Sequence, residues 1–554
     1  MHRIPFAIGL CGLMIVCSAS PSVGRQIESD EPVASRRAET VLVDPKPGTG
    51  PELKSVRVKL LRDDAPAAAR VSIVGSDGKA HAPTGAAIRK TKRDVSYFYA
   101  DGSFEVKLPP GRARLEVFGG VETIPQTVSL DPGGDDELPV QSGRWIDMAA
   151  RGWYSGDSHV HLHTGGPIEV TVADALVAAR AEGVNYVNLC ASNNLGNDLR
   201  DADLVTGKPH PVSTDQQLLV FGEEMRSTIY GHMQFFGIDR LVEPQYTGFD
   251  ETPNRNDFPA NHAMATEAVR RGGVVTYGHP LFAGQPFPFD KELAKGSGAA
   301  RELPIDAVLG VVHAVDLMSY NCDEDRSAEL WYRLLNCGLK LSACVGTDAL
   351  LDQSTEPLGG ERVYVKTLGP LSMRSWLDGL RSGRTFVTNG PVPTIEVDGK
   401  APGDTVELAA AGKVRVVAKV ESYAPFNKLE VIVNGEVAAH ADFAAGDAAG
   451  VQAGRLEVEL PIGRSSWVAL RVRGPEHPSV FDGPAWAHTS PVYVTVAGGK
   501  IASRRDAEFF VGWIDQMLRV VAARDRYPSV EDRRQVEALF RKAQDEFRTL
   551  AGRN

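Results

Sequence analysis

Residues 157–163 read Asp-Ser-His-Val-His-Leu-His, an acidic residue followed by three alternating histidines. In an extended strand, side chains two positions apart point to the same face. His159 and His161 can therefore bind one metal ion from one side, and neutral imidazole suits zinc, manganese or iron. Asp157 shares their parity and is expected to orient a ligand histidine. Two glycines soon follow His163, so we expect it to contact substrate or solvent rather than a metal.

The sequence around this stretch alternates short apolar runs with amphipathic ones. A helix expected over 170–182 leads into a strand over 185–190, and a helix over 261–271 leads into a strand over 274–277. Repeated β-then-α units favour a closed, barrel-like α/β domain, which we place at residues 149–392. Chemistry in such domains collects at the carboxyl ends of the strands, so polar residues that end apolar strands are the candidates for a site.

Four further residues meet that criterion. One acid of the pair Glu223-Glu224 follows the apolar run 218–221, His232 precedes the next apolar run, and His279 and Asp348 each follow a strand of their own. The alternatives are a surface turn for His279 and a helix N-cap for Asp348. A carboxylate can bridge two cations, so the ordered set of histidines and acids suits a binuclear hydrolytic site.

Composition and missing motifs narrow the function. The net charge of −11 gives no basic footprint for nucleic acid. Residues 149–392 contain no Gly-x-Ser-x-Gly motif for a nucleophilic serine, and no phosphate-binding loop or dinucleotide fingerprint follows a strand. We therefore expect a small-molecule substrate. These features do not indicate an oligomeric state.

Several motifs together resemble the PHP superfamily (polymerase and histidinol phosphatase), and more narrowly its carbaryl-hydrolase-like branch of metallohydrolases. The resemblance covers roughly residues 150–392. It rests on GDSHVHLHTGG at 156–166, GEEMRSTIYGHM at 222–233, TYGHP at 276–280, GTDA at 346–349 and GRTFVTNGP at 383–391. It implies a distorted (β/α)7 barrel with metals at the carboxyl ends of the strands.

The resemblance also implies a set of metal ligands. Glu224 would bridge two ions, and its neighbour Glu223 is expected to be exposed. One metal would be held by His159, His161, Glu224 and Asp348, and a second by Glu224, His232 and His279. Catalytic roles would fall to Glu224, Asp348 and Asp157.

The chain departs from the wider family pattern in two places. Many members have Asp-His where Ser192-Asn193 stands here, and Asp-x-His where Asp348-Ala349-Leu350 stands. Both missing histidines would serve a third metal position, so the resemblance implies one or two divalent transition metal ions, zinc, manganese or iron. The residues expected to contact substrate are Asn193, Arg226, Tyr230, Tyr320 and Asn389.

The flanking regions read as accessory domains. Period-two alternation predicts an N-terminal β-sandwich over 53–148 and a C-terminal, Ig-like β-sandwich over 393–498, whose His440, His477 and His488 are expected at the surface. Two apolar stripes behind capping patterns predict a helical hairpin over 499–554. The fold class is thus multidomain α/β and β: a PHP-like barrel flanked by two β-sandwiches, with a C-terminal helical hairpin.

The N-terminus is expected to direct export. Residues 1–20 combine Arg3 with a short apolar run and small residues, as signal peptides do, and 21–52 read as a flexible linker. Cys17 raises the alternative of a lipoprotein, but the preceding Val16 is larger than such sites prefer. No later apolar run is long enough for a transmembrane segment, so we expect a periplasmic or secreted mature protein.

The function expected from these features is that of an exported metal-dependent hydrolase, using a metal-bound hydroxide on an ester, carbamate or amide bond. One alternative is a phosphodiesterase or phosphatase of PHP type. The other is a non-catalytic scaffold that binds carbohydrate or protein.

Overall fold

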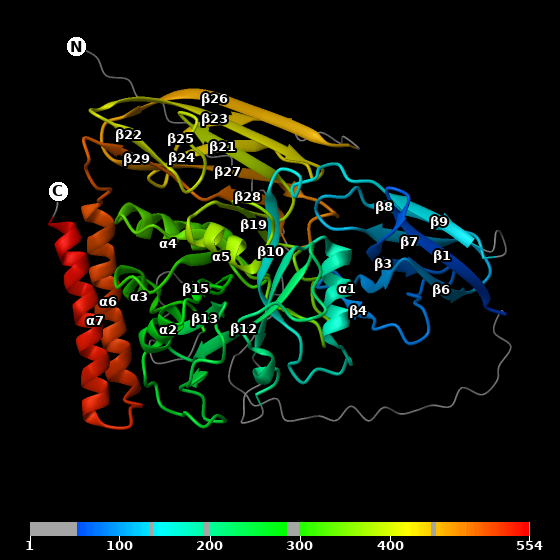
Figure 1. The fold of residues 1–554 in the computed structure, drawn as a ribbon, viewed down its shortest axis with the longest axis horizontal. Helices are drawn as coiled ribbons and strands as arrows, with labels where there is room; N and C mark the ends of the chain where they lie inside the picture. Colours follow the sequence, from blue (N-terminus) through cyan, green and yellow to red (C-terminus); the bar gives the residue numbers. More distant parts are fainter. Residues whose placement is uncertain are drawn as a thin grey trace, which may run out of the picture. The chain divides into compact units, whose positions relative to one another are not determined.

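The computed structural model describes residues 52–132, 137–191, 199–284, 298–444, 450–481 and 483–552. The expected signal peptide (1–20) and all but the last residue of the expected linker (21–52) lie outside these ranges. Within them, no helix combines the length and the apolar character needed to cross a membrane. Figure 1 shows the order of the helices and strands along the chain.

Two small sheets form the N-terminal part and enclose one apolar core. In the first sheet β1 pairs with β2, β6 and β9, and the second has the order β4-β5-β3-β7-β8. Alternate residues of β1 are buried, which places Val58 and Leu60 against Val71 and Leu115 of the facing sheet. The strands are β1 (Lys54–Arg62), β2 (Ala65–Pro66), β3 (Ala68–Val74), β4 (Arg89–Lys90), β5 (Ser96–Asp101), β6 (Ser103–Leu108), β7 (Ala113–Phe118), β8 (Gln126–Leu130) and β9 (Glu137–Ser142).

The central part is built on a mixed sheet. Parallel pairs join β10 to β11, β11 to β12, β15 to β16 and β16 to β17, whereas β13 runs antiparallel to both β12 and β15. Only residues 228–230 separate β12 from β13, too few for a crossover helix, so the β-then-α repeat is interrupted there. The strands are β10 (Trp153–His161), β11 (Tyr186–Ala191), β12 (Leu218–Ser227), β13 (Gly231–Phe236), β14 (Tyr246–Thr247), β15 (Val274–Tyr277), β16 (Ala314–Met318), β17 (Ser342–Val345), β18 (Ala349–Leu350), β19 (Arg362–Lys366) and β20 (Thr385–Thr388).

Helices pack on this sheet, and α1, α4 and α5 begin at side-chain caps. Thr171 and Asp174 form a capping box at the start of α1, which ends at Gly183 in the left-handed conformation (φ +64°). Ser372 and Ser375 form the equivalent box at α5. The helices are α1 (Val172–Glu182), α2 (Asn261–Arg270), α3 (Leu303–Val308), α4 (Glu324–Asn336) and α5 (Met373–Arg381), with a short 3-10 helix at Ala202–Leu204.

The C-terminal strands again form two layers around an apolar core. One layer is β21-β23-β26, and the other contains β22, β24, β25, β27, β28 and β29. Strand β28 pairs with β20, so the second layer continues the central sheet instead of forming a separate one. The strands are β21 (Val392–Val397), β22 (Thr405–Leu408), β23 (Gly412–Ser422), β24 (Lys428–Val433), β25 (Glu436–Asp442), β26 (Gln452–Ile462), β27 (Ser466–Glu476), β28 (Pro484–Thr489) and β29 (Val492–Val496).

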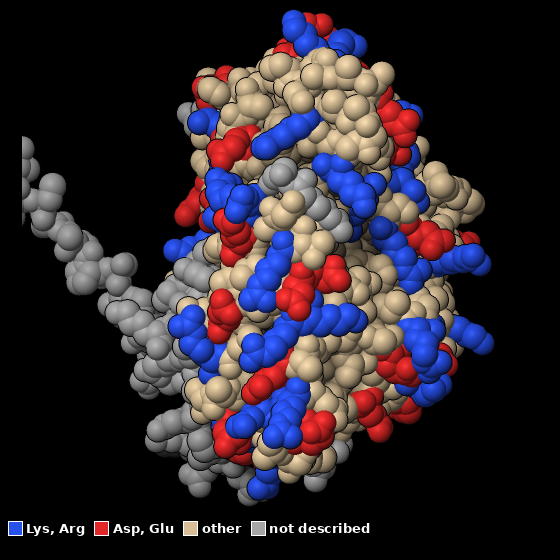
Figure 2. All heavy atoms as spheres, turned by 90° about the vertical axis from the view of Figure 1, so that its left-hand side faces the viewer, with Lys and Arg blue, Asp and Glu red and all other residues tan. Residues whose placement is uncertain are grey.

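Two long antiparallel helices, α6 (Arg504–Arg524) and α7 (Val530–Ala551), end the described chain. Ser503 and Ser529 cap them through the backbone N–H groups of Asp506 and Asp532. The hairpin packs against α3 and α4 of the central part (Figure 1). Figure 2 views the molecule from this side and shows basic and acidic side chains interspersed over it, without a patch of one sign.

Candidate metal centre

Six of the expected site residues, which lie on or beside five strands, meet in one place. His159 and His161 lie at the C-terminal end of β10, Glu224 lies on β12, and His232 lies on β13. His279 lies two residues after the end of β15, and Asp348 immediately precedes β18. The parallel pairing of β18 with β10 brings Asp348 beside the two histidines of β10, and its N–H donates to the His159 carbonyl at 2.8 Å.

Four of the six side chains surround one point at distances that suit a cation. The Nε2 atoms of His159 and His161 lie 3.0 Å apart. Each of them is 3.3 or 3.4 Å from an oxygen of Glu224 and from Oδ1 of Asp348. Ligand atoms at about 2.1 Å from one ion lie roughly 3.0–3.4 Å from each other, so this donor set fits a transition metal.

A second group shares the same carboxylate. His232 Nδ1 lies 2.9 Å from Glu224 Oε1, and His279 Nε2 lies 3.8 Å from the same oxygen. Three overlapping groups have ligand atoms within 4.8 Å of one another and can each hold an ion: His159, His161 and Glu224; His159, His279 and Asp348; and Glu224, His232 and His279.

Burial and mutual charge set the protonation of the cluster. Burial favours a neutral Glu224, but the positive fields of His159 and Arg226 outweigh it and hold the pKa of this carboxyl well below its usual range. Burial likewise opposes a charge on His161, yet hydrogen bonds to Asp348 and Glu224 raise its pKa to about 10. For His232 burial dominates and lowers the pKa to about 4, which leaves a neutral imidazole with a lone pair for a cation.

Two of the six residues adopt backbone conformations that L-residues rarely take. The φ angle is +27° at His279 and +60° at Asp348. Such conformations cost free energy and persist where the surrounding structure imposes them, commonly at functional sites. Phe282 stacks on the His279 ring with centroids 4.9 Å apart and helps to fix it.

Asp157 holds backbone rather than a histidine ring, which corrects the expectation that it orients a ligand imidazole. Its carboxylate accepts hydrogen bonds from the N–H groups of His159, Thr347 and Gly359 and from the Thr347 hydroxyl. The register of β10 against β11 shifts between Asp157 and Val160, so parity along the strand does not carry the carboxylate to the ligand face. Asp157 therefore anchors the loop that presents Asp348.

One backbone carbonyl and one side chain contact the Nδ1 atoms of the two β10 histidines. His161 Nδ1 lies 3.2 Å from the Cys190 carbonyl. His159 Nδ1 lies 3.2 Å from the amide nitrogen of Gln234, which the sequence analysis missed. The sequence contained a signal for Gln234, because Gln234 and His232 lie two positions apart in one strand and therefore share a face.

Two charged residues close to Glu224 on β12, Glu223 and Arg226, differ in their placement. Glu223 is fully buried, which corrects the expectation that it is exposed, and its Oε2 accepts from the Val242 N–H at 2.7 Å. It alternates with Glu224 along β12 and so faces away from the cluster. The Arg226 side chain is 28% exposed, with Nε 3.7 Å from Glu224 Oε2, so it lies at the edge of the cluster.

The remaining expected contacts lie elsewhere. The Tyr230 hydroxyl donates to the Asp257 carbonyl and meets the Tyr527 hydroxyl of the C-terminal hairpin, so the expectation that it contacts substrate is wrong. The buried Tyr320 hydroxyl donates to the Pro357 carbonyl, and this interaction already satisfies it. Asn193 lies outside the described residues.

His163 stands apart from the cluster, in line with the expectation that it is not a ligand. Its Nδ1 lies 2.7 Å from Asp201 Oδ1 and its Nε2 lies 2.9 Å from the Val170 carbonyl. It belongs to none of the three groups of candidate ligands.

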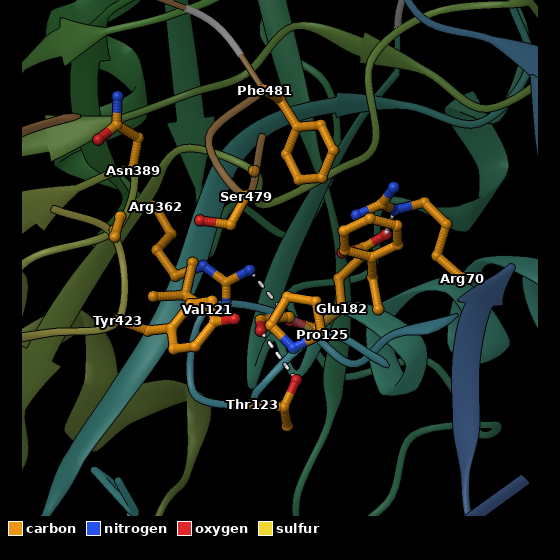
Figure 3. A pocket seen from close by; sticks show the side chains of 15 residues that line it. Arg70, Val121, Thr123, Pro125, Glu182, Arg362, Asn389, Tyr423, Ser479 and Phe481 are labelled. Carbon is orange, nitrogen blue, oxygen red and sulfur yellow. Dashed lines mark hydrogen bonds and ion pairs between the residues drawn. The ribbon is translucent and has the colours of Figure 1, made fainter. Parts of the chain in front are cut away.

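A cavity lies where the two sandwiches meet the central part (Figure 3). Arg70 lies there between the rings of Phe118 and Phe481 and pairs with Glu182 at 2.7 Å. Asn389 lines the same cavity, and its amide bonds two backbone groups of the C-terminal part. None of the lining residues belongs to the metal cluster, so Asn389 lies apart from the candidate ligands, and its contact with substrate stays a prediction.

Comparison with known proteins adds little to this geometry. No family model matches the chain, and no curated protein does. One solved structure with a matching chain is a crystal structure of an endonuclease Q complex with a 27-mer duplex substrate bearing an abasic lesion at the active site. It shares 12% identity over 42% of this chain and 56% of its own, with a TM-score of 0.26.

Proposed function

We propose that the protein is a metal-dependent hydrolase that acts on an ester, carbamate or amide bond, with one or two zinc, manganese or iron ions. The observation that carries this proposal is the shared carboxylate: Glu224 belongs to two overlapping groups of candidate ligands and has a pKa well below its usual range. The order of the ligands along the chain, which resembles that of the PHP superfamily, supports the same assignment.

Each residue of the cluster has a part in this proposal. His159, His161, Glu224 and Asp348 would hold one ion, and Glu224, His232 and His279 would hold the second. When bound, such ions lower the pKa of a water molecule and offset negative charge on the reacting oxygen. The ionised Glu224 offsets the repulsion between two cations. Asp348, whose side chain is 23% exposed, marks the side on which the cluster opens to solvent.

A phosphodiesterase or phosphatase is the second candidate, and Arg226 favours it. Its guanidinium lies at the edge of the cluster, partly exposed and 5.9 Å from the Phe249 ring centroid. A guanidinium forms strong, paired hydrogen bonds with phosphate oxygens. A substrate with an anionic phosphoryl group would therefore find a partner beside the ions.

A screen over aryl esters, carbamates and phosphoesters, with zinc, manganese or iron added, tests both candidates against the scaffold alternative. Hydrolysis that requires the metal and is lost in His161→Ala supports the proposal. His163→Ala is the matched control, because it removes a histidine of the same run that touches no other candidate ligand. A parent protein that binds no metal and cleaves none of these bonds would instead point to a non-catalytic scaffold.

Export to the periplasm or medium is proposed with this function, on the evidence of residues 1–20. The mature protein should lack these residues. Recovery of the protein from its native compartment with Met1 intact would contradict export.

A further inference from the structure

His159 belongs to two of the three groups of candidate ligands, so the state of its ring matters to the whole cluster. A neutral imidazole can bind a cation through Nε2 only if its proton lies on Nδ1. Nδ1 is then a donor, and metal-binding histidines almost always give that proton to a carboxylate, a carbonyl or water. The side chain that faces Nδ1 therefore decides whether His159 can serve.

That side chain is Gln234, and its surroundings hold it in place. The His159, Gln234 and Thr276 side chains are all fully buried. Gln234 on β13 lies directly opposite Thr276 on β15, and Thr276 Oγ1 donates to Gln234 Oε1 at 2.9 Å. A Cβ atom at Gly278 would lie 2.3 Å from Gln234 Nε2, so a glycine there leaves room for the amide.

The Gln234 amide is an adaptable partner for a histidine. Its nitrogen lies 3.2 Å from His159 Nδ1, and a half-turn of the amide places its oxygen there without moving the chain. The Thr276 hydroxyl can accept as well as donate, so it bonds either end of the amide. The Cys190 carbonyl opposite His161 Nδ1 has no such choice, because it is backbone.

We propose that Gln234 is the positioning residue of His159. In the metal-bound protein its Oε1 accepts the Nδ1 proton of His159, and its Nε2 donates to Thr276 Oγ1. This fixes the tautomer and the rotation of the ring, so that Nε2 presents its lone pair to the cation. The inference rests on the proposed metal site and extends it by one residue.

Two substitutions distinguish a role of Gln234 as hydrogen-bond acceptor from a role in filling space. Gln234→Met keeps the approximate volume but offers no strong acceptor, whereas Gln234→Glu keeps an acceptor in the same place. Titration of the full-length protein with Co²⁺, followed by visible absorption and by competition with a chelator, gives the affinity and the ligand geometry. Gln234→Met should weaken Co²⁺ binding about 10- to 100-fold and alter the absorption bands. Gln234→Glu should restore both to nearly the parent values.

Asn185→Leu is the control for a general loss of buried hydrogen bonds. Asn185 bonds Ser155 and Gln216 at the opposite end of the strands from the cluster, so its loss should lower Tm without changing the absorption bands. Parent-like Co²⁺ affinity in Gln234→Met would overturn the inference. So would a Gln234→Glu protein that folds but binds as weakly as Gln234→Met, and this second comparison decides the matter if Gln234→Met does not fold. A parent that binds no Co²⁺ would overturn the proposed function itself.

Discussion

Glu223 and Glu224 are adjacent in sequence, yet β12 turns them to opposite faces. Glu224 points into a group of imidazoles, and Glu223 is buried on the opposite face of the strand. Burial raises the pKa of Glu223 to about 8, since little but the Val242 N–H offsets the cost of a buried charge. The two carboxyls thus differ in protonation because their surroundings differ.

This contrast predicts the effect of Glu223→Gln. The amide keeps the size of the side chain and can still accept from the Val242 N–H, and it removes a group that resists ionisation. Metal content and turnover should therefore stay close to the parent values, and Tm above pH 8 should not fall. A large loss of turnover in a folded Glu223→Gln protein would show that the cluster depends on this carboxyl.

At the residue scale, polar residues at strand ends pointed to the region of the cluster, and the resemblance to the PHP superfamily selected Glu224 over Glu223 and grouped the six side chains. The sequence did not predict their hydrogen-bond partners. Parity along a regular strand gives the face of a side chain, but the shift in β10 moved Asp157 off that face. The Tyr230 hydroxyl was misplaced because its partner, Tyr527, lies in a distant helix pair.

Among the elements, the C-terminal hairpin shows how local signals and packing agree. The capping patterns predicted where α6 and α7 begin, and the structure starts both helices at those serines. The sequence could not show which surface the hairpin covers. Trp513 reveals it: the ring is 2% exposed, and its Nε1 donates to the Arg301 carbonyl of the central part at 2.7 Å.

Trp513→Ala should therefore destabilise more than the hairpin alone. Removing a large buried aromatic side chain typically costs about 3–5 kcal/mol. The central part should lose stability with it, because Tyr527 and Arg524 of the same hairpin bond Tyr230 and Asp257. Thermal unfolding checks this when it is followed by far-UV circular dichroism, which reports backbone structure and does not need the Trp513 signal. Unchanged Tm would contradict the packing, and Leu518→Ala on the partly exposed side of α6 is a milder control.

The continuous sheet is the part of the architecture that the sequence missed. Turn signals such as Asn434-Gly435, both with positive φ, locate hairpins well. They carry no information on which edge strands meet. β20 pairs with β19 on one edge and with β28 on the other, so the central and C-terminal parts share one hydrogen-bonded sheet.

For the whole molecule, the half-buried His313 and the buried His488 predict acid sensitivity. Burial lowers the pKa of His313 to about 4 and that of His488 to about 3, from an ordinary value of 6.5. His488 is fully buried against Tyr332, which corrects the expectation that it lies at the surface. Below about pH 6.5 the unfolded chain takes up protons that the folded chain does not.

The share of the stability that depends on these two neutral histidines should therefore be complete above about pH 6.5 and be lost as the pH drops toward 4. Each proton taken up only on unfolding lowers the free energy of unfolding by about 1.4 kcal/mol per pH unit. His488→Gln removes one of the two titrating groups while keeping an acceptor for Tyr332, so Tm should fall less steeply between pH 6.5 and 4.5. An identical slope in parent and variant would contradict this assignment.

The central claim is that Glu224 bridges two cations, and the metal content of Glu224→Gln tests it most directly. A neutral amide cannot offset the repulsion between two ions, and His232 and His279 are both neutral donors, so the second ion should be lost first. The first ion would keep Asp348, His159 and His161 as ligands. We predict two equivalents of transition metal in the parent and in Glu223→Gln, at most one in Glu224→Gln, and a fall in turnover of at least about 100-fold. Two equivalents and parent-like turnover in Glu224→Gln, with an unchanged Tm, would contradict the account.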